Sequence, residues 1–380
     1  MEIYLDNAST TEPFPEVIDA MMPYLSDEYG NPSTIYSIGR RTRKAIDEAR
    51  DTVAGLLSVK SSEISFCSGA TESICTLLIG AAFAAKEGRK KFVTSSIEHK
   101  AILKVAHWLM DYLDWEVTLI DPMPSGHINP KEFTEACSKG CGLASLQWVN
   151  NEIGTIQPIE EVGLKLKGMG IPFHTDVVQG IGKFPLDLGA TGIAMASASS
   201  HKFYGPKGCG LSYIREGIDV RPLLVGGGQE LERRAGTENV AGIVGTATAL
   251  SVLARGQKAF VERLVELERI FFDTLNSSGI EYALNGGEPR VPGMMNIFFP
   301  GVESESLLLH ADREGLCISA GSACASGSTE PSYVITALGG NRMRGLCSAR
   351  VTFGWHNTNE DAITGAKTIG SIVAKLRGST

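Results

Sequence analysis

The chain of 380 residues is predicted to be an α/β protein with a large domain and a second, smaller α/β domain. In the large domain, helices cover both faces of a mostly parallel sheet. Three observations favour this architecture. Short apolar runs alternate with longer helical patterns from residue 60 onward, and the 43 glycines suit the many strand-to-helix turns that such alternation requires. A long helical stretch from about residue 240 to residue 276 then precedes a change in pattern.

The expected strands of the large domain, in chain order, cover residues 64–68, 92–95, 116–120, 143–149, 172–175, 193–197 and 211–214. The helices expected between them include 71–86, 101–113 and 159–167. Beyond the long helix, strands are expected at 294–299 and 350–353. We therefore assign residues 15–255 to the large domain, and residues 1–14 together with 256–380 to the small domain.

Composition excludes several classes of protein. A formal net charge of −8 argues against direct binding of nucleic acid. The longest apolar run, residues 77–85, is too short to cross a bilayer, and the acidic first residues do not resemble a signal peptide. The eight cysteines show no C-x-x-C spacing, so neither a metal site nor a disulfide framework is indicated. We expect a reduced, cytoplasmic protein.

Lys202 is the first candidate for catalysis. It lies in the segment SASSHKFYGPKG (197–208), directly after a predicted strand and beside His201. A partly desolvated lysine in such a turn can form a Schiff base with a carbonyl cofactor. A solvated loop lysine is the ordinary alternative for one residue considered alone.

Polar side chains follow several other predicted strands. The segment SGATES (68–73) opens a helix, where free N–H groups and the helix dipole favour an anion, although an ordinary helix cap would also explain it. Asp176 ends a strand and could hold the protonated nitrogen of a pyridine ring, or cap the following turn. His99 and Asn151 follow two further strands. Convergence of these groups on one edge of the sheet indicates a binding site.

Cys324 lies in a run of small residues, GSACASGS (321–328). A buried packing cysteine is more typically surrounded by Val, Leu and Ile. The run is typical of a mobile, partly exposed loop in which a thiol can reach both a cofactor and a partner.

These motifs together resemble those of the cysteine desulfurases, which are pyridoxal-phosphate enzymes of the class V aminotransferase family with the fold-type I architecture. The resemblance extends over nearly the whole chain. The segment around Cys324 is similar to the branch in which the catalytic-cysteine loop is extended. The matching segments are YLDNASTT (4–11), GNPS (30–33), GATES (69–73), EHK (98–100), VNNEIG (149–154), HTD (174–176), HK (201–202), RAGT (234–237) and GSACAS (321–326).

The resemblance implies roles for the cofactor-binding residues of the large domain. Lys202 would form the Schiff base with pyridoxal 5′-phosphate and move the substrate's Cα proton, while Asp176 would pair with the pyridine nitrogen. His99 would stack on the ring. The other implied cofactor contacts are Gln179 and Asn151 near the ring hydroxyl, Ala70, Thr71, Ser199 and His201 at the phosphate, and Thr237 from the second subunit of a homodimer.

The implied substrate is L-cysteine, held by Asn31, Asn151 and Arg350, of which the arginine would bind the carboxylate. The Cys324 thiolate would attack the substrate sulfur, leaving alanine and a persulfide that passes to an acceptor protein. Iron–sulfur cluster assembly is the implied pathway, with tRNA thiolation and DNA phosphorothioation left open. Another pyridoxal-phosphate lyase or aminotransferase, such as a selenocysteine lyase, is the alternative, and an inactive assembly platform is a third reading.

Two positions depart from the family pattern. Ala235 stands where serine is common and would weaken phosphate binding slightly. Ser200 stands where Gly or Ala is common and would add a hydroxyl beside the cofactor.

Overall fold

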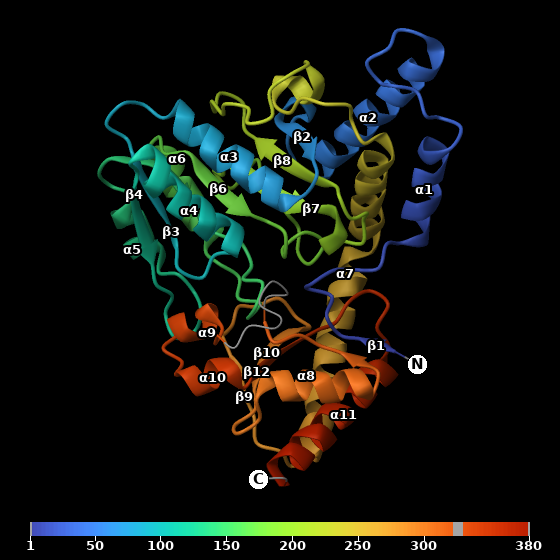
Figure 1. Cartoon of the computed structure of the whole chain (residues 1–380), viewed down its shortest axis with the longest axis vertical. Coiled ribbons are helices and arrows are strands. Elements are labelled where there is room, and N and C mark those ends of the chain that lie inside the picture. The colour runs from blue at the N-terminus through green and yellow to red at the C-terminus, as the bar shows by residue number, and fades with distance from the viewer. Residues whose placement is uncertain (1, 322–329, 379–380) are drawn as a thin grey trace.

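In the view of Figure 1, the largest sheet lies in the upper part of the structure, a computed structural model that describes residues 2–321 and 330–378. Its seven strands lie in the spatial order β2 (Ile64–Cys67), β8 (Gly210–Ile214), β7 (Met195–Ser199), β6 (Phe173–Asp176), β5 (Cys141–Ser145), β3 (Lys91–Ser95) and β4 (Glu116–Ile120). Strands β7, β6, β5, β3 and β4 run parallel to one another, whereas β8 is antiparallel to both of its neighbours. The mixed α/β architecture with a mostly parallel sheet is confirmed.

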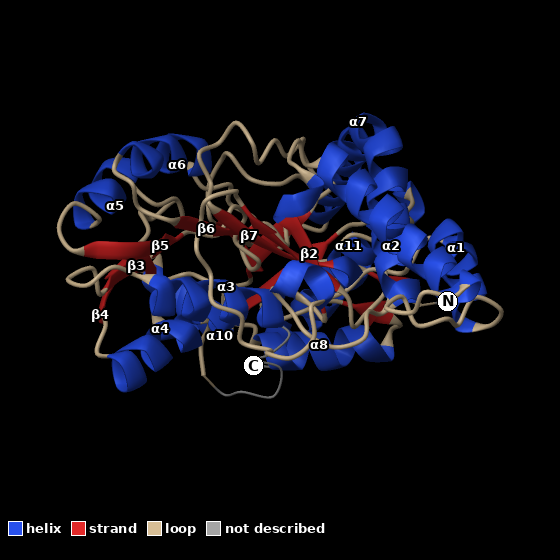
Figure 2. Cartoon of the chain, turned by 90° about the horizontal axis from the view of Figure 1, so that it is seen from above, coloured by secondary structure: helices blue, strands red, loops and turns tan. Residues whose placement is uncertain are grey.

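Helices cover both faces of this sheet. Figure 2 shows α5 (Pro130–Ala136) and α6 (Ile159–Gly168) on one face, and α3 (Ala70–Ala84) and α4 (Lys100–Leu113) on the other. In α4 the buried residues are Ile102, Val105, Ala106 and Leu109, which recur at the helical spacing of three and four. This stripe explains why α4 packs on the sheet. The helix stops where Asp114 adopts a left-handed conformation, with φ of 53°.

A smaller unit follows in the chain. Its antiparallel sheet has the order β12 (Ser348–Thr352), β10 (Met294–Phe298) and β9 (Ala283–Asn285). A second, two-stranded sheet pairs β1 (Ile3–Tyr4) with β11 (Leu316–Cys317) in parallel. The helices of this part are α8 (Ser304–Arg313), α9 (Tyr333–Ala337), α10 (Arg342–Leu346) and α11 (Asn359–Gly378).

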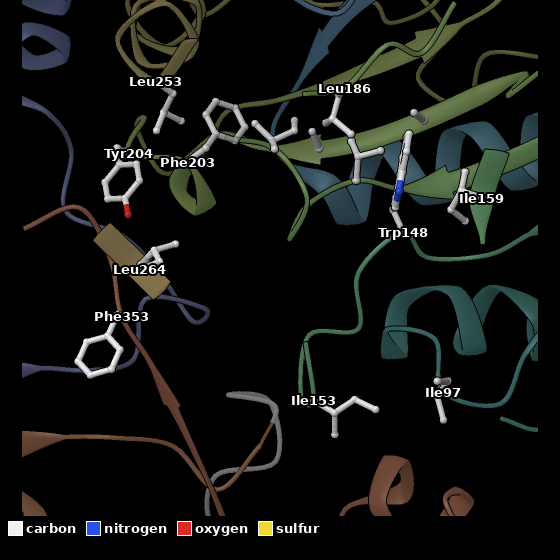
Figure 3. Close-up of a cluster of buried hydrophobic side chains, with 14 of the residues drawn as sticks. Ile97, Trp148, Ile153, Ile159, Leu186, Phe203, Tyr204, Leu253, Leu264 and Phe353 are labelled. Carbon is white, nitrogen blue, oxygen red and sulfur yellow. The ribbon is translucent and has the colours of Figure 1, made fainter. Parts of the chain in front are cut away.

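Helix α7 (Val240–Ser277) connects the two parts (Figure 1). Its 38 residues give a length of about 57 Å. It contacts α1 (Pro15–Leu25), α2 (Ser37–Leu56) and α11. The boundary that we proposed at residue 255 lies inside this helix. Figure 3 shows buried Leu253 and Leu264 of α7 in the same apolar cluster as Trp148 and Phe353, so the core continues along α7.

One strand is shorter in the structure than the sequence predicts. We expected a strand over residues 143–149, but β5 ends at Ser145. The chain turns soon afterwards because the Asn150 side chain accepts hydrogen bonds from the N–H groups of Glu152 and Ile153 at 2.8 and 3.0 Å. Within residues 2–321 and 330–378, no helix combines the length and apolar character needed to span a membrane.

Candidate active site

The strands β3, β5, β6 and β7 run in parallel, and their carboxyl ends therefore meet at one edge of the sheet. A cavity of about 560 Å³ opens at this edge, within the range typical of small-molecule sites. The residues that follow the four strands and line the cavity are His99, Asn151, Asp176 and Lys202. The convergence predicted from the sequence is thus present.

The start of α3 forms one wall of the cavity. Its first residues, Ala70 and Thr71, follow Gly69, which has φ of 156° and provides no side-chain cap. The first N–H groups of the helix therefore have no capping side chain and suit an anion. Gly210 allows this arrangement, because a Cβ at that position would lie 2.6 Å from the Gly69 Cα.

Lys202 ends a short 3₁₀ turn, Ser200–Lys202, that directly follows β7. Its Nζ donates hydrogen bonds to the carbonyl oxygens of Ala8 and Ser9, at 2.7 and 2.6 Å. The amine is thus held in the cavity by the N-terminal segment. His201 lies beside it, and burial together with Lys202 lowers the pKa of His201 to about 4.

His99 caps the start of α4, and its Nδ1 accepts a hydrogen bond from the Ala101 N–H at 3.1 Å. Burial lowers the pKa of His99, while Asp176 acts in the opposite direction. The ring is therefore neutral, and its proton is on Nε2 because Nδ1 is the acceptor. A neutral imidazole suits contact with the face of another ring.

Asp176 and Gln179 also line the cavity. The Asp176 carboxylate accepts from the Val178 N–H at 2.9 Å, and burial raises its pKa while His99 and Lys202 oppose the shift. Gln179 donates from Nε2 to the Ala8 carbonyl at 2.9 Å. Its Oε1 accepts from Nζ of Lys183 at 3.0 Å.

Arg350 of β12 is almost fully buried and also lines the cavity. One of its terminal nitrogens donates to the Asn151 carbonyl at 2.7 Å, and the other donates to Asp6 and Ser9, each at 2.7 Å. Within the described part of the chain, Arg350 Nε and the Asn151 amide oxygen are buried without a hydrogen-bond partner. Unpaired buried polar atoms in a cavity wall indicate a polar ligand.

The structure gathers most of the predicted site residues around this one cavity. Those that line it are Ala70, Thr71, His99, Asn151, Asp176, Gln179, Ser199, His201, Lys202 and Arg350. Asn31 and Thr237 do not line it within one chain, since Asn31 is exposed and bonded to the Ser33 N–H, and Thr237 is exposed. Cys324 lies outside the described residues.

The hydroxyl of Ser200 is not beside the cavity, and that expectation was wrong. Ser200 is fully buried, and its Oγ accepts from the Thr246 hydroxyl of α7 at 3.0 Å.

Sequence reasoning also missed the contacts of Asp6 and Ser9 with Arg350. Both residues lie in the YLDNASTT motif, which marked the segment as matching the family but did not indicate that Asp6 and Ser9 contact Arg350. Lys183 was missed because a lysine four residues after a glutamine is an ordinary helical-spacing pair.

Comparison with known proteins agrees with this geometry. Residues 3–363 match the family described as aminotransferase class-V. The cysteine desulfurase IscS of Dictyoglomus turgidum is 42% identical over 99% of this chain and 95% of its own length. The chain belongs to the class V aminotransferase family. Within this family, the curated relatives of this chain are cysteine desulfurases, and they support cysteine desulfurase activity for this chain.

Solved structures extend the similarity to the fold of this class V enzyme. A "NifS-like protein" superposes with a TM-score of 0.92 at 31% identity, covering 99% of this chain and all of its own. A structure described as "SspA in complex with cysteine" superposes with a TM-score of 0.83 at 33% identity, covering 93% of this chain and 99% of its own.

Class V aminotransferases use pyridoxal phosphate, and the side chains of this cavity fit that group. The uncapped start of α3 suits the phosphate, the Lys202 amine suits the aldehyde, and the Asp176 carboxylate suits the ring nitrogen. The phosphate, the aldehyde and the ring nitrogen of the cofactor therefore each have a complementary group in the cavity wall.

Proposed function

We propose that this class V enzyme removes sulfur from L-cysteine with bound pyridoxal phosphate, releases alanine, and carries the sulfur as a persulfide on Cys324. The observation that supports this most is the presence of Lys202 and buried Arg350 in the wall of one cavity. An amine that can bind a carbonyl cofactor and a guanidinium that can bind a carboxylate together select an amino acid.

The cofactor would supply an electron sink that makes bonds at the amino acid's Cα and Cβ labile. Lys202, Asp176, His99 and Gln179 would hold it, with Ala70, Thr71, Ser199 and His201 at the phosphate. Arg350 and Asn151 would hold the substrate carboxylate, and Asn31 would contact the substrate as the family motif implies.

Two side chains of the protein, Lys202 and Cys324, would carry out the proton transfer and the sulfur transfer. Lys202 would take the Cα proton of the substrate. The Cys324 thiolate would attack the substrate sulfur, so that an S–S bond forms as the Cβ–S bond breaks. The electron pair of the broken bond stays with the carbon skeleton, which takes up protons and leaves as alanine. The sulfur transfer is thus balanced without an external oxidant.

The test measures alanine and sulfide formed from L-cysteine in the presence of a reductant. We expect equal amounts from the wild type, and loss of both with Cys324→Ala. Cys75→Ala on α3 is the matched control, because Cys75 is partly buried and absent from the cavity wall. Alanine that persists in Cys324→Ala would show that Cys324 is not the sulfur carrier. Lys202→Ala should abolish the cofactor absorbance.

The acceptor is a further part of this proposal. We assign the enzyme to a cytoplasmic sulfur-transfer pathway, with iron–sulfur cluster assembly as its destination, because the matching motifs extend over nearly the whole length of the desulfurases. Affinity capture of partners by enzyme loaded with L-cysteine, compared with Cys324→Ala, tests it. Capture of an iron–sulfur scaffold protein by the loaded wild type would support the assignment. Capture of a tRNA-modifying or DNA-modifying protein instead would redirect it.

A further inference from the structure

Glu152 lies between the two described ends of the chain segment that carries Cys324. Its carboxylate accepts a hydrogen bond from the Ser332 hydroxyl at 2.5 Å. The same carboxylate oxygen, Oε2, also lies against Gly321, where a Cβ would lie 2.8 Å from it. Gly321 has φ of 130°, which a larger residue rarely adopts. One side chain therefore contacts the residues on both sides of the interval 322–329.

The same two ends are tied to the residues proposed to hold substrate and cofactor. Before the segment, Ser319 exchanges backbone hydrogen bonds with Arg350, and its hydroxyl donates to the Gly321 carbonyl at 3.1 Å. After the segment, the Tyr333 hydroxyl donates to the carbonyl of Glu98, the neighbour of His99, at 2.7 Å. Glu152 itself directly follows Asn151.

Glu152 is also an unusual residue to bury. It is 1% exposed, and a carboxylate removed from water destabilises the folded state unless it is well paired. An apolar residue would fill the space without that cost. A role in positioning explains why an acidic side chain stands here.

We infer that Glu152 is a positioning residue for sulfur transfer, which fixes both ends of the Cys324 segment relative to the substrate site. The inference rests on the proposed function. Transfer between two sulfur atoms depends steeply on their approach, and a misplacement of about 1 Å can lower a rate by about a hundredfold. Cofactor and substrate binding use other residues and do not require this contact.

The test measures amino-acid binding and sulfur transfer separately. The first readout is the absorbance change of the loaded enzyme on mixing with L-cysteine. The second is the amount of persulfide on Cys324 in a single turnover, measured by alkylation and mass spectrometry. For Glu152→Gln we expect persulfide formation to slow by about tenfold, with the absorbance change altered by less than about twofold. Ser332→Ala, which keeps the carboxylate, should behave in the same way.

Two controls make the comparison specific. Ser332→Thr retains the hydroxyl and should restore persulfide formation to the wild-type rate. Glu63→Gln changes another buried glutamate, which accepts from the N–H groups of Lys60 and Glu216. None of these three residues lines the cavity, so this variant should alter neither amino-acid binding nor sulfur transfer. Equal losses in both readouts, or unchanged persulfide formation, would overturn the inference. Absence of persulfide in the wild type would instead refute the proposed function.

Discussion

Burial keeps the Glu98 carboxyl protonated well above its usual range, because removal from water raises its pKa from 4.5 to about 8. One oxygen accepts from the Ser95 hydroxyl and the Gln147 N–H, both at 2.9 Å. Between these two pKa values the folded protein binds a proton that the unfolded chain has lost. The free energy of unfolding therefore falls as pH rises through this window.

Glu98→Gln should remove this dependence, because the amide resembles the protonated acid and cannot ionise. We expect the melting temperature of the variant, relative to the wild type, to rise between about pH 5.5 and about pH 8.5. Thermal unfolding of both cofactor-free proteins across this range is the measurement. A constant difference would mean that Glu98 is ionised in the folded protein.

Lys183 fixes the orientation of the Gln179 amide, because its Nζ donates a hydrogen bond at 3.0 Å to Oε1, and an amide oxygen can only accept. The amide nitrogen of Gln179 is then left to donate within the cavity. Lys183→Met removes this constraint while keeping a similar volume. We expect about fivefold weaker binding of pyridoxal phosphate, corresponding to about 1 kcal/mol, and equilibrium dialysis measures it. Lys86→Met is the control, since Lys86 does not line the cavity. Unchanged affinity would show that Gln179 needs no such partner.

At the scale of elements, α2 is attached to the segment before Thr237 by a buried ion pair. Arg50 donates two hydrogen bonds to Glu230 at 2.8 and 3.0 Å, and the Glu230 carboxylate also accepts from the Phe66 N–H at 2.7 Å. Glu230 and Leu231 have φ of 47° and 58°, a conformation that non-glycine residues rarely adopt. The ion pair stabilises this strained turn.

Removing one partner leaves the other as an unpaired buried charge. We expect Arg50→Met to lower the free energy of unfolding by about 3 kcal/mol. Lys44→Met, which removes an exposed pair with Glu48, should change it by less than about 0.5 kcal/mol. Denaturant unfolding of the two variants makes the comparison. Similar small changes in both would show that the buried pair contributes nothing beyond an exposed one.

At the scale of the whole molecule, Thr237, which the family motif implies as a phosphate contact, does not line the cavity of its own chain. Thr237 is exposed, and α1 presents the apolar side chains of Ile18, Met22 and Leu25 to solvent, each at least 50% exposed. Such a stripe on one helix is typical of an interface. We expect a homodimer, in which Thr237 of one subunit contacts the phosphate in the other.

Mixed dimers test this arrangement. Lys202→Ala and Thr237→Glu should each be inactive alone, the second because its carboxylate repels the phosphate. If Thr237 acts across the interface, each mixed dimer has one site with both native residues. Co-expression of differently tagged chains should then restore about one quarter of wild-type activity. No restoration would place Thr237 in the site of its own chain.

Much of this molecule was predictable from local patterns. The strand and helix periods located β4 and α7 within a residue or two, and polar residues after strands located the cavity. Local patterns do not predict which segments far apart in the sequence contact one another. Strands β1 and β11 have two residues each, too few for a period. The contacts of Arg350 with Asp6 depend on tertiary packing, as does the burial of the Ser200 hydroxyl against α7.

The pairing of β1 with β11 has a consequence for synthesis of the protein on the ribosome. Ile3 aligns with Leu316, so β1 acquires its partner only after the whole large sheet, which lies between them in the sequence, has been translated. The segment that follows β1 also provides groups of the site. The Ala8 and Ser9 carbonyls accept hydrogen bonds from Lys202, and the Asp6 carboxylate accepts one from Arg350. Because closing so long a loop is slow, the large sheet can form first, and a nascent chain becomes competent to bind an amino acid only after β11 and β12 have been translated.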